Sequence, residues 1–388
     1  MADTSKLLGL NEILKDISKK YGNKVAKYNV DDLGIDDIIP SGSPTLDFSL
    51  YGGFPNDRFV EISGPEGSGK TTVAFRIAAE YQRRELERNP DNPRAIIMVD
   101  NEGTADPVWA KVMGYDMSEE ALVPTIIIRP EGQSAEEIFD MITRMMKTGE
   151  VGLVILDSLA TLVPMQIAGQ PLTEKDQMGG IARALGRFAN ENIGILRKYR
   201  VLFIGINQVR ENLSGYGQKE ITPGGRAWKH ACSVRLKCKK GDFFDSEGKT
   251  LTANAESPAG HIVEVFVAKT KTCKWDRKLA YFHLDYNRGI DIVQDTIDVA
   301  LKFGFVDNSV QGTYKIINAD GTETKVRGKA NFVTFLNEHK EVWKSIYDRC
   351  YEKMKQKEDP YIKSFEEMLG INLGEKFGFD ETTNVEEM

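Results

Sequence analysis

Long apolar segments are absent from this sequence of 388 residues, although 41% of its residues are hydrophobic. No run approaches the ~20 apolar residues that a membrane-spanning helix needs. The first twenty residues mix acidic and basic side chains throughout, unlike a secretory signal peptide. The sequence therefore predicts an intracellular, cytoplasmic protein that does not enter a membrane.

Cysteine and histidine are also scarce, with four of each. The cysteines show no C-x-x-C spacing, which is the usual pattern of a structural zinc site. Isolated cysteines in an intracellular protein are normally reduced thiols. We therefore expect neither a zinc site nor a disulfide framework.

Net positive charge is missing as well, because the formal charge is -7 at pH 7. The distribution is uneven. Residues 358–388 contain nine acidic and two basic residues, whereas residues 207–240 contain eight Lys or Arg and only two Glu. The second segment alone has the positive charge typical of a nucleic-acid-binding surface. The acidic tail could compete with duplex DNA for that surface, or it could simply be solvated.

A glycine-rich stretch, GPEGSGKT at residues 64–71, lies between a strand-like segment and a helix-like run from Lys70 towards Arg88. It fits the pattern G-x-x-x-x-G-K-[ST], in which glycines let backbone N–H groups surround phosphate oxygens. The lysine neutralises the β and γ phosphates, the Thr71 hydroxyl coordinates Mg²⁺, and the helix N-terminus favours the anion. The residues expected to bind the nucleotide are Gly64, Pro65, Glu66, Gly67, Ser68, Gly69, Lys70, Thr71 and Thr72.

The alternative is a glycine-rich turn without a ligand, but strand, loop and helix all fall in register with the motif. Nucleotide binding by itself leaves the function open. Kinases, GTPases, helicases and recombinases all share this loop.

Short runs of apolar and β-branched residues alternate with helical patterns through the middle of the chain. They are RFVEIS, AIIMVD, TIIIR, VGLVILD, VLFIGINQ, SVRLKC, HIVEVFVAK and LAYFHLD. Long crossovers between buried strands predict a mostly parallel sheet covered on both faces, and the closely spaced last runs predict hairpins at its edge. The expected fold class is a doubly wound α/β core over residues 41–290.

Smaller modules flank this core. Residues 1–40 contain a helix with one apolar side, formed by Leu7, Leu10, Leu14 and Ile17, and then an extended connector. Residues 291–357 predict a small α+β domain with a hairpin turning at Asp320 and Gly321, followed by two helical runs. The acidic tail occupies residues 358–388.

Polar residues end three of the predicted strands. Asp157 follows LVIL and could hold Mg²⁺, Glu102 follows IMVDN and could activate an attacking water, and Gln208 ends GINQ and could contact the γ phosphate. Each could instead be an ordinary solvated residue after a strand. Because α/β proteins place ligands at the carboxyl edge of the sheet, we expect the three to converge on the phosphate loop.

Several longer motifs resemble the RecA recombinases of bacteria and of some large phages. They are IPSGSPTLDFSLYGGFPNDRFVEISGPEGSGKTT, MVDNEGTADPVWAKVMGYD, LVILDSLATLVP, GINQVR, TPGGRAWK and VAKTKTCKWDRK, in the order and spacing of that family. The resemblance covers most of the chain and implies a RecA-type ATPase core. It implies that Lys70 and Thr71 bind phosphate and magnesium, Asp157 supports the metal, and Glu102 activates water.

The same resemblance implies that Asp106 and Trp109 hold the adenine. The family usually has tyrosine where Trp109 stands, and either ring can stack on a base.

Two loops are assigned to DNA by this resemblance. The first, MQIAGQPLTEKDQMGGIARALG, contains Met178 and Arg183, and the second is VRENLSGYGQKEITPGGRAW. Cations suit phosphates, and apolar side chains can enter the gaps between bases of a stretched single strand. The alternative for the second loop is a glycine-rich surface loop without a ligand. Its expected contacts are Arg210, Leu213, Gly224, Gly225 and Arg226.

The resemblance also implies contacts between subunits. It places the N-terminal helix on the next protomer, although packing on its own domain is the ordinary alternative. VAKTKT places Lys269 and Lys271 on an edge strand, from which they would reach the ATP of an adjacent subunit; solvated surface lysines are the alternative reading.

These inferences predict an ATP- and Mg²⁺-dependent homologous recombinase. It would form helical filaments on single-stranded DNA, pair them with homologous duplex and exchange strands, with Gln208 linking the γ phosphate to the second DNA loop. A hexameric helicase of the same core fold and a non-catalytic filament mediator are the alternatives. The host, the loader proteins, repressor cleavage and the rate of hydrolysis do not follow from the sequence.

Overall fold

The computed structural model of the chain describes residues 8–21, 37–168, 179–211, 220–318 and 321–355. The chain divides into two compact units, residues 1–34 with 356–388, and residues 35–355. In the first unit the described part is α1 (Leu8–Tyr21), whose Leu10 and Ile13 side chains are exposed. The predicted N-terminal helix is thus confirmed, while Leu7, residues 22–36 and the acidic tail lie outside the described residues.

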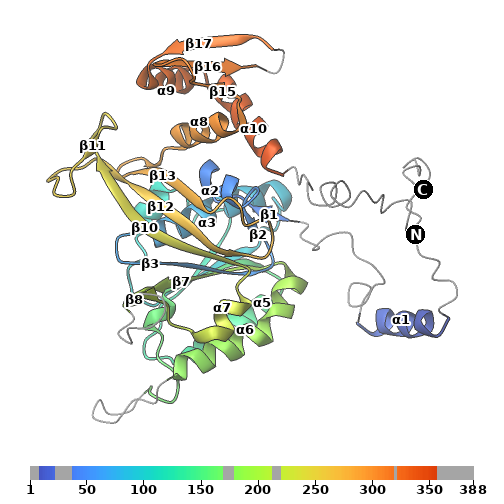
Figure 1. Cartoon of the computed structure of the whole chain (residues 1–388). Coiled ribbons are helices and arrows are strands. Elements are labelled where there is room, and N and C mark those ends of the chain that lie inside the picture. Colours follow the sequence, from blue (N-terminus) through green and yellow to red (C-terminus); the bar gives the residue numbers. More distant parts are fainter. Residues whose placement is uncertain (1–7, 22–36, 169–178, 212–219, 319–320, 356–388) are drawn as a thin grey trace, which may run out of the picture. The chain divides into compact units, whose positions relative to one another are not determined.

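A ten-stranded sheet forms the centre of the second unit in the described part of the chain (Figure 1). Its order is β14-β13-β12-β10-β3-β7-β6-β4-β5, and β11 pairs with β10. The strands are β3 (Phe59–Gly64), β4 (Ala95–Asp100), β5 (Thr125–Ile128), β6 (Val151–Asp157), β7 (Leu202–Gln208), β10 (Val234–Phe244), β11 (Thr250–Leu251), β12 (Gly260–Thr270), β13 (Leu279–Asp285) and β14 (Gly289–Ile290).

Six neighbouring strands, from β10 to β5, pair in parallel, and the remaining pairings are antiparallel. The prediction of a mostly parallel sheet with hairpins at one edge is therefore confirmed. The register sets Gly64 opposite Gln208 and Asp100 opposite Asp157. These four residues lie at the carboxyl edge of the parallel strands, where α/β proteins bind ligands.

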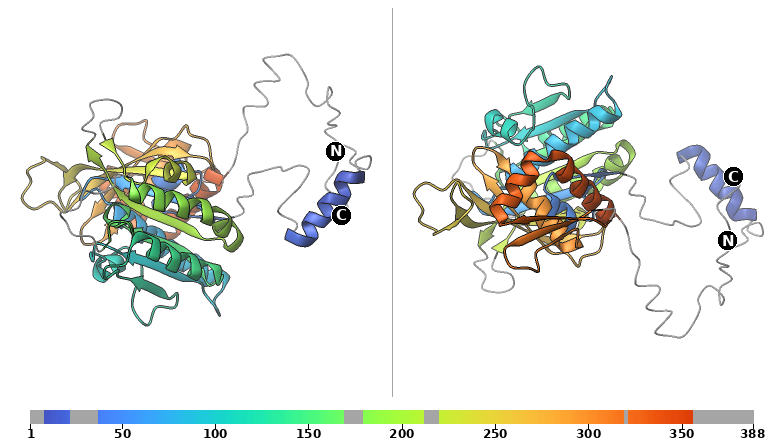
Figure 2. Two further views of the ribbon diagram at one scale, coloured as in Figure 1. Left: turned by 90° about the horizontal axis from the view of Figure 1, so that it is seen from below. Right: turned by 90° about the horizontal axis from the view of Figure 1, so that it is seen from above.

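Helices cover both faces of the sheet (Figure 1). One face packs on α2 (Pro44–Ser49), α3 (Lys70–Arg88) and α4 (Pro107–Val112). The other packs on α5 (Ala135–Lys147), α6 (Gly180–Tyr199) and α7 (Gly225–Ala231) (Figure 2). The stacked rings of Phe139 and Phe188 join α5 to α6. The inner strands β3, β4, β6 and β7 therefore have both faces buried, which explains their nearly continuous apolar sequences. Ile126 and Ile127 of the edge strand β5 are exposed.

Local sequence signals explain where these helices begin. Gly69, in the left-handed region at φ +83°, precedes α3, and the predicted run from Lys70 to Arg88 is helical over that full span. Ser134 precedes α5 and exchanges hydrogen bonds with Glu137, which is the arrangement called a capping box.

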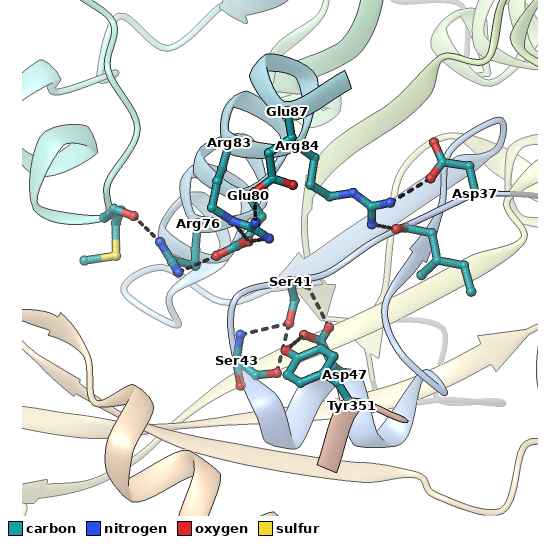
Figure 3. A network of polar contacts seen from close by, with 12 residues as sticks. Asp37, Ser41, Ser43, Asp47, Arg76, Glu80, Arg83, Arg84, Glu87 and Tyr351 are labelled. Carbon is teal, nitrogen blue, oxygen red and sulfur yellow. Dashed lines mark hydrogen bonds and ion pairs between the residues drawn. The ribbon is translucent and has the colours of Figure 1, made fainter. Parts of the chain in front are cut away.

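Short elements join the larger ones. They are β1 (Ile38–Ile39) paired with β2 (Phe54–Pro55), η2 (Leu159–Thr161), and β8 (Arg210–Glu211) paired with β9 (Glu220–Ile221). Asp37, just before β1, accepts a hydrogen bond from Arg84 of α3 (Figure 3). Arg88 of the same helix also donates to Asp37, and these contacts fix the start of the core.

The C-terminal part has its own apolar cluster, which includes Ile297, Phe332 and Cys350. It comprises α8 (Ile292–Phe303), β15 (Val306–Asp307), β16 (Thr313–Ile317), β17 (Glu323–Arg327), α9 (Lys329–Glu338) and α10 (Lys340–Lys355). The antiparallel pair β16 and β17 confirms the hairpin, although Asp320 lies outside the described residues. The boundaries proposed at residues 40, 290 and 357 stay predictions.

Buried polar contacts join this part to α2. The Tyr351 hydroxyl of α10 donates to Asp47 (Figure 3). The Ser43 hydroxyl, just before α2, donates to Asp295 of α8 at 2.6 Å. Burial raises the pKa of both Asp47 and Asp295 to about 7.

Among the described residues, no helix has the length and apolar character required to cross a membrane.

Candidate nucleotide and DNA site

The phosphate loop links β3 to α3 in the geometry that its glycines predict. Gly67 and Gly69 have φ angles of +66° and +83°, and a Cβ atom at Gly64 would lie only 2.4 Å from the Cys238 carbonyl oxygen. Glycine is therefore required at Gly64 by space and at the other two by conformation. The resulting concave loop has the form that surrounds phosphate oxygens.

Lys70 lies against this loop. Its Nζ donates a 2.7 Å hydrogen bond to the Pro65 carbonyl, and the Ser68 hydroxyl donates to the same oxygen at 2.7 Å. Desolvation lowers the pKa of Lys70, while nearby Asp157 opposes that shift. An anionic ligand would give this ammonium a stronger partner than a carbonyl oxygen.

Thr71 and Asp157 meet as the sequence predicts. The Thr71 hydroxyl donates a 2.7 Å hydrogen bond to Oδ2 of Asp157, across from α3 to the end of β6. Burial raises the pKa of Asp157 to about 6. A hydroxyl and a carboxylate beside a phosphate loop are the hard oxygen ligands that Mg²⁺ prefers, so these residues fit the ion.

Glu102 and Gln208 also come together. Nε2 of Gln208, at the end of β7, donates a 2.8 Å hydrogen bond to Oε1 of Glu102, in the loop after β4. Two further residues, which were not predicted from the sequence, hold Glu102 and its loop in place. The Ser158 hydroxyl donates to Glu102, and Asp100 accepts from the backbone N–H of Thr104 at 2.9 Å, which shapes the loop.

Those two residues carried a weak signal in the sequence. Both lie at or just after the carboxyl end of a strand, Asp100 in IIMVD and Ser158 after LVILD. A polar residue at that edge is a candidate for a supporting role, but the sequence does not tell which partner it holds.

The predicted adenine-binding residues lie close to the phosphate loop. Asp106 precedes α4 and accepts from the Val108 backbone N–H at 2.8 Å. Trp109 Nε1 donates to the Thr72 hydroxyl at 3.1 Å, which holds the indole against the first turn of α3. The structure thus brings Trp109 to the phosphate-binding helix.

The prediction that Lys269 and Lys271 lie on an edge strand was wrong: Lys269 is on β12, an inner strand, and Lys271 follows its last residue, Thr270. β12 lies between β10 and β13, and Lys269 pairs with Arg235 of β10. Only the last residues of β12 extend past the end of β13, whose pairing stops at Phe266. The error has a simple reason: a sequence shows a strand's apolar pattern but not the long-range partners that cover its two sides.

Both lysines contact the end of α7. Lys269 Nζ donates to the Lys229 carbonyl, and Lys271 Nζ donates to the His230 carbonyl at 2.7 Å. Desolvation, with a further contribution from Lys271, lowers the pKa of Lys269 to about 8. Cations at the carboxyl end of a helix interact favourably with its dipole.

The described DNA-loop residues gather where α6 and α7 begin. A Cβ atom at Gly225 would lie 2.9 Å from Cβ of Ala182, so the first turn of α7 contacts the turn of α6 that carries Arg183. Arg183 donates to the Gln166 side chain at 2.7 Å, and Arg226 is exposed. The described ends of the two predicted DNA loops, at the first turns of α6 and α7, therefore adjoin.

The remaining predicted contacts divide into two groups. Arg210 is exposed on β8 and pairs with Ile221 of β9, which closes the base of the second loop. Gly224 precedes α7 at φ +102°. Met178 and Leu213 lie outside the described residues.

This chain is similar to known proteins over most of its length. The family model described as the RecA N-terminal domain matches residues 8–291. Protein RecA of Thermus thermophilus is 35% identical over 319 residues, covering 79% of this chain and 84% of that protein. Protein RecA of Phytoplasma mali is 29% identical over 352 residues, covering 89% of this chain and 95% of that protein. A crystal structure of the RadB recombinase aligns with a TM-score of 0.46 and 23% identity, covering 65% of this chain and 98% of that one.

Proposed function

This chain is a recombinase that belongs to the RecA family, and on that premise we propose how its residues perform the reaction. It is a DNA-dependent ATPase. Its filaments coat single-stranded DNA, pair with homologous duplex and exchange strands. ATP acts as a switch on DNA binding, and the product is new base pairing with no new covalent bond in the DNA.

Hydrolysis uses the groups around the phosphate loop. Lys70 leaves the Pro65 carbonyl for the β and γ phosphates, and Thr71 and Asp157 hold Mg²⁺. The ion neutralises charge on the phosphate oxygens when it is bound. Glu102, held by Ser158, accepts the proton of the attacking water. Trp109 and Asp106 hold the adenine beside the same helix.

The hydrogen bond between Gln208 and Glu102 carries the proposal of an ATP switch. We infer that the Gln208 carboxamide turns from Glu102 towards the γ phosphate when the triphosphate is bound, which weakens this bond. Gln208 directly precedes the second DNA loop, which runs from β8 to α7. Triphosphate therefore favours the loop conformation that binds DNA, and hydrolysis favours release.

The filament arises from head-to-tail contacts, in which a surface of one protomer meets a different surface of the next. The N-terminal helix, within residues 1–40, contacts the neighbouring core, residues 41–290. Lys269 and Lys271 leave α7 and reach the nucleotide of that neighbour. Residues 291–357 form a separate C-terminal domain, residues 358–388 an acidic tail, and the protein acts in the cytoplasm.

Negative-stain electron microscopy with single-stranded DNA and a nonhydrolysable ATP analogue tests this proposal. A helical filament supports it. A closed ring would instead favour a hexameric helicase, and neither assembly would favour a mediator. Lys70→Ala is the matched control, because weak nucleotide binding should prevent filament formation under the same conditions.

A further inference from the structure

Glu61 is a charged residue in the centre of the core. It lies on β3, three residues before the phosphate loop, and its side chain is fully buried. Its neighbours in register are Gly205 of β7 and Arg235 of β10. A Cβ atom at Gly205 would lie 2.8 Å from the Trp228 ring, so the missing side chain makes room for that indole.

Three donors from three elements meet the Glu61 carboxylate. Oε1 accepts from Nδ2 of Asn207 at 2.8 Å and from Nε1 of Trp228 at 3.2 Å. Oε2 accepts from Nε of Arg235. We call these four residues the Glu61 cluster. Asn207 is on β7, Trp228 on α7 and Arg235 on β10.

The Glu61 cluster extends to the stem of the second DNA loop. Nδ2 of Asn207 also donates to the Pro223 carbonyl at 3.0 Å, and Arg235 donates to the Thr222 hydroxyl at 3.4 Å. Pro223 directly precedes Gly224. In the part of the chain that the structure describes, the buried Oδ1 of Asn207 has no hydrogen-bond partner, so this amide is held through Nδ2 alone.

The same cluster reaches the nucleotide site. Asn207 is the chain neighbour of Gln208, and successive residues of a strand point to opposite faces of the sheet. A shift of β7 that carries Gln208 to the γ phosphate therefore also moves the Asn207 amide, which bonds to the loop stem. The Asn207 side chain thus links the positions of Gln208 and Pro223. Glu61, on the neighbouring strand β3, holds that side chain.

We propose that Glu61 and Asn207 are positioning residues that transmit the nucleotide state from Gln208 to the second DNA loop. The inference rests on the proposed ATP switch and names the contacts through which it acts. Stability alone gives a poor account of this carboxylate, because apolar residues that fill the space of a buried ion pair are often at least as stabilising. Its three donors instead join β7, which carries Gln208, to α7, at the end of the second DNA loop, and to β10.

The test compares Asn207→Ala with a matched control, Asn192→Ala. Asn192 is also fully buried, accepts from the Thr143 hydroxyl at 3.2 Å, and donates to the Phe188 carbonyl at 2.9 Å within α6. Both variants lose a buried amide, so a purely structural effect should be similar in the two. Thermal unfolding measures that effect directly.

The readout is the Kd for fluorescein-labelled oligo(dT), measured with a nonhydrolysable ATP analogue and with ADP at one salt concentration. The ratio of the two Kd values measures coupling between nucleotide and DNA. Such couplings typically amount to about 5- to 150-fold. In Asn207→Ala the ratio should fall by about tenfold, which is the effect expected from losing a hydrogen bond to a charged group. If the wild-type ratio is itself below about tenfold, the ratio in the variant should fall to one. In Asn192→Ala it should stay within about twofold of wild type.

Glu61→Gln is the second variant, and it tests the inference if Asn207→Ala does not fold. The amide keeps one acceptor oxygen and the size of the side chain, but it loses the charge that faces Arg235. A reduced ratio in a folded variant supports the inference. An unchanged ratio, or an equal loss of affinity with both nucleotides, overturns it. A wild-type ratio of one would overturn the ATP switch itself, which is a distinguishable failure.

Discussion

Gln208 donates a 2.8 Å hydrogen bond to Glu102, although the two residues are 106 positions apart in the chain. One belongs to the strand that leads into the second DNA loop, and the other is the proposed base for hydrolysis. A residue that senses the γ phosphate and a residue that activates water therefore share one contact. Hydrolysis and DNA binding are expected to respond to each other through it.

Glu102→Gln should separate nucleotide binding from hydrolysis. The amide keeps the size of the side chain but accepts a proton poorly, so turnover should fall by about a hundredfold or more. ATP binding and filament formation should persist. Lys70→Ala should instead weaken nucleotide binding, because it removes the phosphate-binding ammonium. Steady-state hydrolysis and equilibrium nucleotide binding measure the two effects, and near-normal turnover in Glu102→Gln would exclude this residue as the base.

Arg226→Ala and Arg210→Ala should each weaken binding to single-stranded DNA of any sequence. A contact with one phosphate releases counterions, so its loss should lower the slope of log affinity against log salt by roughly 0.7. Fluorescence anisotropy over a salt series measures this slope. Arg144→Ala is a suitable control, because Arg144 is an exposed arginine of α5 that pairs with Asp140. If both loop variants behave like the control, the second loop is not a DNA contact.

Asp295→Asn should change how stability depends on pH. The pKa of Asp295 is raised by burial to about 7, whereas an unfolded aspartate ionises near pH 4. The folded chain therefore retains a proton that the unfolded chain loses, and stability falls as pH rises from about 4 to 7. Asparagine cannot ionise, so the variant does not lose stability in this way as the pH rises. The melting temperature of the variant, relative to wild type, should rise by several degrees between pH 5 and pH 8.

The control for this experiment is Asp348→Asn, which removes a half-exposed carboxylate paired with Lys344 on α10. Its melting temperature relative to wild type should vary little over the same range. A pH-independent difference for Asp295→Asn would show that this carboxylate is already ionised in the folded chain over this range, as it is in the unfolded chain.

Much of the nucleotide site could be predicted from the sequence because its chemistry is local. A strand, a glycine-rich loop and a helix are contiguous from Phe59 to Arg88, so their order in the chain is also their order in space. Asp157 and Glu102 follow short buried strands of a parallel sheet, whose ends must meet at one edge.

The contacts that the sequence could not predict join residues far apart in the chain. Glu61 meets Arg235 across 174 positions, and Asp47 meets Tyr351 across 304. In RFVEIS, Glu61 looks like a solvated residue of an alternating strand, and nothing local indicates three buried donors. The strand that carries Lys269 was wrongly predicted to be an edge strand for the same reason, since its pairing with β13, from Gly260 to Phe266, is tertiary.

Lys269 and Lys271 should complete the active site of a neighbouring protomer. Lys70→Ala and the double variant Lys269→Ala, Lys271→Ala should each be nearly inactive as DNA-dependent ATPases. Mixed in equal amounts, they should restore about a quarter of the interfaces, because each head-to-tail contact needs one intact part from each chain. Activity should therefore exceed that of both parents.

Energy transfer between fluorescently labelled variants checks that the two assemble together on DNA. Co-assembly without a gain in hydrolysis above the average of the parents would contradict the shared site. Normal hydrolysis by the double variant alone would show that the two lysines only cap the carboxyl end of α7.

The central claim is that this chain exchanges DNA strands under the control of ATP, and a strand-exchange assay measures it directly. Protein assembled on a single-stranded oligonucleotide is mixed with a duplex of the same sequence whose identical strand is labelled, and release of that strand is followed on a gel. We predict release with ATP and a homologous duplex, and none with ADP or with a heterologous duplex. No release with ATP from a protein that hydrolyses ATP on the same DNA, or equal release from the heterologous duplex, would contradict the account.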